Sequence, residues 1–302
     1  YFLGPHRQGG LNRYAADLAA AQAAAGHRIF GLFPGGSILP RRPCIRRRKM
    51  AEGVEYYELL GGVPVPLLEG IRDPGMILNT SARRLPDSVL RVFCDRVRPD
   101  VLHIHTWMGF PPELLYEMKR RNVRVVFSTH DYFGLCPRVN FIDDTGELCV
   151  APDNGKCSRC NRHAPGARYL ALRNWGGVMK FKVLLKPLRH LRRRRTAAEP
   201  ETAIRDYAAL RKYYRELLTN CDKIHFNSGV SAAVYRRFLP EVTGRVIPIV
   251  HRGIADRREV RRIGNGKVRL CFIGSAAPYK GLPMLLNALR QLRERGIVNW
   301  QL

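Results

Sequence analysis

Short apolar segments alternate with segments of helical period along most of this chain, and this alternation restricts the fold more than any other feature. Between Gly10 and Gly26 apolar residues recur every three or four positions, which predicts a helix that ends at the glycine. A buried strand, Arg28–Phe33, follows directly, and the same order of helix and apolar strand returns at Pro86–His105 and Pro111–Ser128. Strands that are apolar throughout are buried on both faces, so the pattern predicts an α/β fold with a Rossmann-like parallel sheet.

Further elements lie on both sides of an irregular region. We expect strands at Val54–Leu60, Lys223–Phe226, Arg245–Val250 and Val268–Ile273, helices at Glu201–Asn220, Val230–Phe238 and Gly281–Arg295, and a basic loop at Arg41–Lys49. Residues 1–250 form the predicted first domain, with an insertion at 131–200 that breaks the alternation. A predicted linker at 251–266, rich in Arg and Gly, leads to the start of a second domain at 267–302.

Both ends of the chain resemble interrupted elements. There is no initiator Met, Tyr1–Gly4 resembles the end of a strand that runs into a loop, and Val298–Leu302 resembles a strand just begun. We therefore expect a first domain that lacks only its first strand, and a truncated second domain.

The charge of the chain narrows the classes of partner. It has 52 Lys and Arg against 25 Asp and Glu, a formal net charge of +27. Such an excess favours an anionic partner: a phosphate-bearing ligand, an anionic membrane surface or nucleic acid. Between Asn154 and Ala198 there are thirteen Lys or Arg and no acidic residue. No apolar run reaches the roughly 18 residues that a membrane-spanning helix needs.

Glycines and polar residues stand where predicted strands end and helices begin, which is where open parallel sheets bind ligands. Gly9 and Gly10 precede the first helix, where they either admit a phosphate or sugar or simply form a turn. His130, with Asp131 beside it, follows a strand, and a histidine there can donate to a sugar hydroxyl. Lys280 stands in a loop before a helix, where a cation can neutralise a phosphate.

His103 and His105 alternate on one predicted strand, so their side chains share one face of the sheet. Because the sequence places no third ligand nearby, we favour one packed and one cleft-lining histidine over a metal-binding pair.

Several of these segments together resemble glycosyltransferase family 4. The matching segments are Gly9–Tyr14, Asp100–His105, Thr129–Tyr132, Phe226–Ser228, and Phe272–Gly274 followed by Pro278–Gly281. Their order and their positions at strand ends agree with the family over most of the chain. The resemblance implies the GT-B fold, in which two Rossmann-like domains hold a nucleotide-sugar donor between them. It also implies a hexosyltransferase-type enzyme that retains the anomeric configuration and needs no catalytic metal.

The resemblance also assigns roles to individual residues. It implies that Gly9 and Gly10 lie near the donor phosphates and the acceptor, that His130 contacts the donor sugar beside Asp131, and that Lys280 binds the diphosphate. Ser275 stands where the family often has an arginine that completes the diphosphate clamp. The acidic motif of the second domain is not among residues 1–302, so we expect these residues alone to be inactive.

Four of the eight cysteines are clustered in the insertion: Cys136, Cys149, Cys157 and Cys160. Four thiolates can hold a tetrahedral structural zinc ion, which would order a polar loop that lacks a core of its own. The alternatives are two disulfides or free thiols, and the spacing does not fit an iron–sulfur cluster. We favour the zinc site and expect no cofactor in catalysis.

The segment Val178–Arg195 mixes apolar residues with Lys and Arg, which suits either a helix on an anionic membrane or a surface helix packed on the first domain. The membrane alternative predicts a cytoplasmic protein at the inner face of the membrane and a lipid-linked or other glycan acceptor. No nucleic-acid-binding motif accompanies the arginines, so nucleic acid is not favoured as a partner. A non-catalytic binding protein on a glycosyltransferase scaffold and a zinc-containing nucleic-acid binder remain as alternatives.

Overall fold

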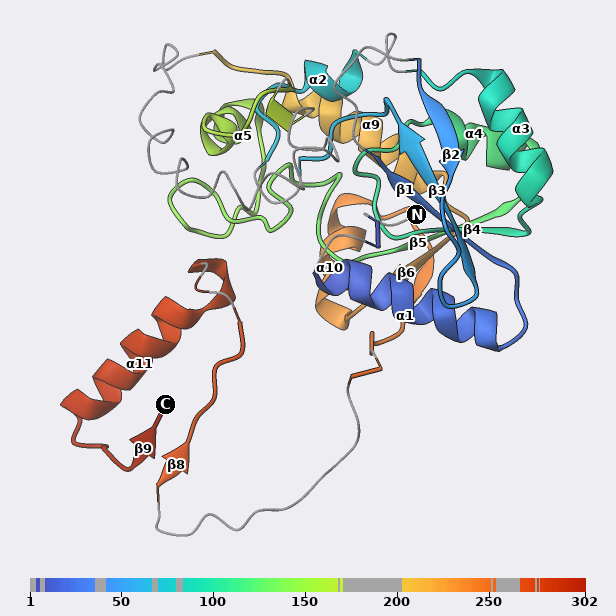
Figure 1. Cartoon of the computed structure of the whole chain (residues 1–302). Helices are drawn as coiled ribbons and strands as arrows, with labels where there is room; N and C mark the ends of the chain where they lie inside the picture. Colours follow the sequence, from blue (N-terminus) through green and yellow to red (C-terminus); the bar gives the residue numbers. More distant parts are fainter. Residues whose placement is uncertain are drawn as a thin grey trace. The chain divides into compact units, whose positions relative to one another are not determined.

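The chain divides into two compact units, Tyr1–Arg252 and Gly253–Leu302 (Figure 1). The computed structural model describes residues 4–5, 9–35, 42–66, 70–79, 84–167, 169–170, 203–250, 252–253, 267–274, 276 and 278–302. The strand end expected at Tyr1–Leu3, most of the predicted linker and the basic segment Val178–Arg195 lie outside the described residues.

The larger unit contains a four-stranded sheet in which all neighbouring strands are parallel. Its order is β4 (Val101–Ile104), β5 (Arg124–Ser128), β6 (Lys223–Phe226) and β7 (Gly244–Val246). Val125 and Phe127 of β5 and Ile224 and Phe226 of β6 are buried, as expected for strands inside an α/β sheet. This sheet confirms the predicted α/β fold, although β7 is shorter than the strand expected at Arg245–Val250.

A second sheet in the same unit has the order β1 (Ile29–Pro34), β3 (Val54–Leu60), β2 (Cys44–Arg47). Strand β1 is parallel to β3, and β2 is antiparallel to it. The prediction of a basic loop at Arg41–Lys49 is therefore wrong. Arg46 and Arg47 belong to an edge strand, where exposed charged side chains are tolerated, and Arg47 Nε lies 2.7 Å from Glu55 Oε1 on β3.

Most helices of the larger unit lie where the apolar periodicity predicts them, whereas the two short helices Gly75–Leu78 and Asn154–Asn161 were not predicted. The helices are α1 (Gly10–Ala24), α2 (Gly75–Leu78), α3 (Asp87–Val97), α4 (Glu113–Arg120), α5 (Asn154–Asn161), α9 (Tyr207–Thr219) and α10 (Gly229–Phe238). Side-chain caps explain where two of them begin: Asp206 accepts a hydrogen bond from Ala209 N at α9, and Ser228 accepts one from Ser231 N at α10. Among the described residues, no helix is both long enough and apolar enough to cross a membrane.

The two described sheets end at β1 and β4, and a cavity of about 760 Å³ is lined by residues of both strands. Residues of α1, such as Ala15 and Ala19, and residues of α3 and α4, such as Phe93 and Leu114, also line this cavity. Within the described residues of the larger unit, the single sheet expected from the alternation of elements is thus observed as two sheets.

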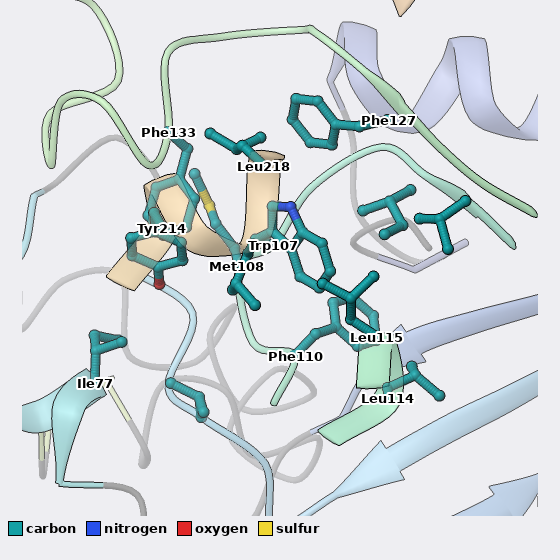
Figure 2. Close-up of a cluster of buried hydrophobic side chains, with 14 of the residues drawn as sticks. Ile77, Trp107, Met108, Phe110, Leu114, Leu115, Phe127, Phe133, Tyr214 and Leu218 are labelled. Carbon is teal, nitrogen blue, oxygen red and sulfur yellow. The ribbon is translucent and has the colours of Figure 1, made fainter. Parts of the chain in front are cut away.

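The first part of the insertion packs on the main hydrophobic core. Phe133, Leu135, Val139 and Phe141 are buried in that core, and the ring of Phe133 lies 4.8 Å from the ring of Tyr214 on α9 (Figure 2). Although this part of the insertion is rich in polar residues, its few apolar side chains attach it to the main hydrophobic core.

The smaller unit consists of one strand–helix–strand crossover. Strands β8 (Val268–Arg269) and β9 (Trp300–Gln301) are parallel and are joined through the 3₁₀ helix η4 (Pro278–Lys280) and α11 (Leu282–Glu294). The predicted helix is confirmed, whereas the strand expected at Val268–Ile273 is only two residues long.

Candidate functional site

Four histidines and a serine gather at the carboxyl-terminal ends of β4, β5 and β6. His103 belongs to β4 and His105 follows it, Ser128 ends β5 with His130 two residues later, and His225 lies in β6. Because the three strands are parallel and adjacent, their carboxyl ends meet at one edge, where polar side chains separated by 25 to 97 residues come into contact.

Ser128 connects two of these histidines. Its hydroxyl oxygen lies 2.7 Å from His103 Nε2 and 2.7 Å from His225 Nδ1, and His225 Nε2 lies 2.7 Å from the carbonyl oxygen of Ile247. A carbonyl can only accept, so His225 donates through Nε2, and in the neutral form of the ring Nδ1 accepts. In that form of His225, Ser128 donates to His225 Nδ1 and accepts from His103 Nε2.

His105 and His130 form a second contact, with 3.0 Å between His105 Nδ1 and His130 Nε2. Burial lowers the pKa of His130 to about 4 and that of His103 to about 3, and it lowers the pKa of His105 in the same direction. All three rings are consequently neutral near pH 7 and can exchange hydrogen bonds with hydroxyl groups. His105 is buried and His103 is half-buried, and both line the large cavity.

The first turns of α1 lie beside this cluster. The ring of Tyr14 is 5.3 Å from that of His130 and 5.8 Å from that of His105. Helix α1 begins at Gly10, has no acidic residue in its first turn, and follows Gly9, whose φ is 135°. A Cβ added at either glycine would meet no described atom within 4 Å, so both backbones are open to a ligand.

Asp131 is held in place by backbone contacts. Its Oδ1 accepts a hydrogen bond of 2.9 Å from Phe133 N, and its carbonyl oxygen accepts one from the hydroxyl of Tyr235. Burial raises the pKa of the Asp131 carboxyl to about 6. The side chain therefore supports the turn that carries His130.

Thr129 joins the loops that follow β5 and β6. Its hydroxyl oxygen accepts hydrogen bonds from Asn227 N at 3.1 Å and from Ser231 Oγ at 2.8 Å. The segments Thr129–Tyr132 and Phe226–Ser228 are thus physically connected at this edge of the sheet.

The remaining residues expected to bind the donor belong to the smaller unit. Lys280 is exposed at the end of η4, and its Nζ lies 5.3 Å from the centre of the Tyr279 ring. Ser275 lies outside the described residues, so its predicted position in the diphosphate site stays a prediction.

The four clustered cysteines are all free and line one small cavity in the insertion, away from the histidines. Within the described part of the chain, no group of three or more His, Cys, Asp or Glu side chains is already spaced to hold a metal ion.

From the sequence we expected no role for Tyr14, Ser128 or His225. A signal for His225 was present, because it lies between two apolar residues of β6, as His103 does in β4. Its partnership with Ser128 spans 97 positions and depends on the pairing of β5 with β6.

A parallel α/β unit with a glycine pair at a helix start and polar side chains at the strand ends is a Rossmann-like domain of the kind found in GT-B proteins. Residues 8–145 match the family model described as Glycosyltransferase Family 4, which confirms the resemblance for the N-terminal domain. The matched range contains Gly9, Gly10, His130 and Asp131. A comparison with curated proteins gives no significant match.

Proposed function

We propose that this protein transfers a sugar from a nucleotide-sugar donor to an acceptor, with retention of the anomeric configuration and without a catalytic metal. The observation that supports this proposal most strongly is the meeting of the α1 start with the histidine cluster inside the range matched by the family model.

The proposed roles follow from the chemistry of each group. The open backbone at Gly9 and Gly10 lies at the positive end of the α1 dipole and would receive the donor phosphates or a polar group of the acceptor. His130 would contact the donor sugar, because a neutral ring can hydrogen-bond a sugar hydroxyl and has no charge that would compete for the donor phosphates. Lys280 would bind the diphosphate as a point charge.

We further propose that the acceptor is a glycan or a lipid-linked precursor and that the protein works at an anionic membrane surface. The net charge of +27 supports this part of the proposal. The test is binding to vesicles that contain anionic lipid, compared with neutral vesicles at the same ionic strength. Equal binding to both would contradict it.

Donor binding can be tested by calorimetric titration with UDP, GDP and their sugars. Replacing Lys280 with Ala should weaken binding of the preferred diphosphate by about 10-fold or more, because a charge-assisted hydrogen bond is worth about 1.5–3 kcal/mol. Arg295→Ala is the matched control, since it removes the same charge from the far end of α11, about 20 Å along the helix.

His130→Gln tests the sugar contact separately, by the ratio of affinities for a nucleotide sugar and for the free diphosphate. The variant should lower that ratio, and His163→Gln, at an exposed position in the insertion, should leave it unchanged. Stabilisation by nucleic acid alone, or a lack of binding by every nucleotide tested, would contradict the proposed function.

A further inference from the structure

The four cysteines of the insertion come from three separate segments that the fold brings to one place. Cys136 lies in the turn after β5, Cys149 follows the bridge between Ile142 and Leu148, and Cys157 and Cys160 belong to α5. All four line the same cavity, whose volume is about 20 Å³. That volume is roughly one water-sized sphere, which suits a single small ion rather than an organic ligand.

Local hydrogen bonds account for this convergence. Asp143 Oδ1 accepts from the backbone N–H groups of Thr145 and Glu147, which closes a tight turn. The turn folds the chain back on itself, so that Cys149 N donates to the carbonyl oxygen of Phe141 at 2.7 Å. The second strand of this small hairpin thereby returns Cys149 to the neighbourhood of Cys136.

Helix α5 supplies the other two thiols in a fixed relation. Asp153 caps the helix by accepting from Lys156 N at 2.8 Å. Cys157 and Cys160 are three residues apart and therefore project from the same face of the helix. A C-x-x-C pair within one short helix, together with two further thiols on the same cavity, provides the four-cysteine ligand set and the Cys spacing of structural zinc sites.

The charges around the cavity also suit a metal–thiolate centre. A zinc ion with four thiolates has a net charge of −2, which needs nearby cations or hydrogen-bond donors. Arg211 on α9 donates from Nη1 to Cys157 Sγ at 3.3 Å, and Arg138 and Lys156 line the same cavity. Two acidic residues lie near the cavity. Asp144 Oδ2 lies 3.8 Å from Arg159 Nε, and Asp143 Oδ1 accepts a hydrogen bond from the Thr145 hydroxyl.

We propose that Cys136, Cys149, Cys157 and Cys160 bind one Zn²⁺ ion as a structural, four-coordinate site. Binding replaces four S–H bonds by four Zn–S bonds and releases four protons to water, without oxidation or reduction of any group. The described thiols are not yet at ligand spacing, so the site closes by rotation of the cysteine side chains around the cavity they already line. With four protein ligands, no position is left open for catalysis.

The expected effect of the metal is to attach the insertion to the first unit. Cys157 is buried in the main core and contacts Arg211 of α9. Asn161, one residue after Cys160, accepts a hydrogen bond from Ile71 N at 3.0 Å. Zinc would therefore link α5, the hairpin and α9, and its loss should loosen residues 131–170 before it unfolds the parallel sheet.

The decisive measurement is the metal content of the full chain purified under reducing conditions, which should be about one zinc ion per chain. Exchange for Co²⁺ should give the intense visible spectrum of a tetrahedral thiolate centre, and this readout does not require a variant. Cys149→Ser should lose most of the bound metal. The matched control, Cys271→Ser, removes an exposed thiol of the smaller unit and should keep about one zinc ion per chain.

Three results would overturn the proposal. The first is a chain that contains no zinc and also fails to take up Zn²⁺ or Co²⁺ when the thiols are reduced. The second is a mass lower by four hydrogens without reductant, which would mean two disulfides. The third is iron with inorganic sulfide in place of zinc. Protection of four thiols from alkylation until a chelator is added would support the proposal, even if the Cys149 variant folds poorly.

Discussion

Lowering the pH from 7 to 5 should destabilise the larger unit through its buried histidines. The pKa of His130 is about 4 in the folded chain, against an ordinary value of 6.5. As the pH falls below 6.5, His130 of the unfolded chain binds a proton, whereas His130 of the folded chain does not bind one until the pH reaches about 4. The contribution of His130 to stability is therefore complete above pH 6.5 and is lost as the pH falls towards 4. His103, whose pKa is about 3, acts in the same direction.

The magnitude follows from the two pKa values of each group. Between pH 7 and pH 5, linkage gives a loss of about 2 kcal/mol for each of His103 and His130. Asp131 acts in the opposite direction, because its folded pKa of about 6 lies above its ordinary 3.8. As the pH falls, Asp131 binds a proton at a higher pH in the folded chain than in the unfolded chain, which stabilises the folded chain by about 1 kcal/mol at pH 5. The net expectation is a loss of about 2 to 3 kcal/mol, to which His105 adds.

Urea unfolding at several pH values measures this loss directly, and His130→Gln isolates one histidine. The variant should lose about 2 kcal/mol less than the original chain between pH 7 and pH 5, because one proton fewer is taken up on unfolding. His163→Gln, at an exposed position, should show the same loss as the original chain. Any loss of metal from the cysteines is common to all three chains and cancels in the comparison.

Two outcomes would refute this reasoning. One is a parallel decline of stability with pH in the original chain and in His130→Gln. The other is a ring proton resonance of His130 that titrates near pH 6.5 in the folded chain, which would show that burial does not keep this ring neutral.

Two further substitutions test packing within the larger unit, one beside Pro34 and one in the insertion. Gly109→Ala should cost about 2–4 kcal/mol in urea unfolding, because φ is +84° and the new Cβ would lie 2.6 Å from Pro34 Cβ, whereas Gly26→Ala, at φ +92° in open space, should cost only about 1 kcal/mol. Equal costs would show that the contact with Pro34 relaxes freely. Asn161→Ala should cost about 2–3 kcal/mol and increase proteolysis within residues 131–170, because it leaves the buried N–H of Ile71 without its acceptor. An unchanged cleavage rate would mean that this hydrogen bond does not hold the insertion.

Local sequence patterns predict part of the candidate site. His130 and Asp131 could be placed at a ligand-binding edge because an apolar strand precedes them and the alternation predicts a parallel sheet. The hydrogen bonds that connect Ser128, His225 and the carbonyl of Ile247 could not be predicted, because they depend on which strands are neighbours in the sheet. Tyr14 was visible only as a helix residue, and its contact with the histidines depends on how α1 packs.

The sequence by itself determined the elements and their type. Apolar periodicity of two kinds separates buried strands from amphipathic helices, and it placed α1, α3, α4, α10 and α11 close to their observed bounds, whereas α9 begins at Tyr207 rather than at Glu201. It failed at β2, because an edge strand does not have to be apolar. Only the tertiary structure decided which distant groups touch: the histidines of three parallel strands, and four cysteines around one cavity. Periodicity records which face of an element is buried, whereas contacts between elements depend on strand order and packing, which no local pattern encodes.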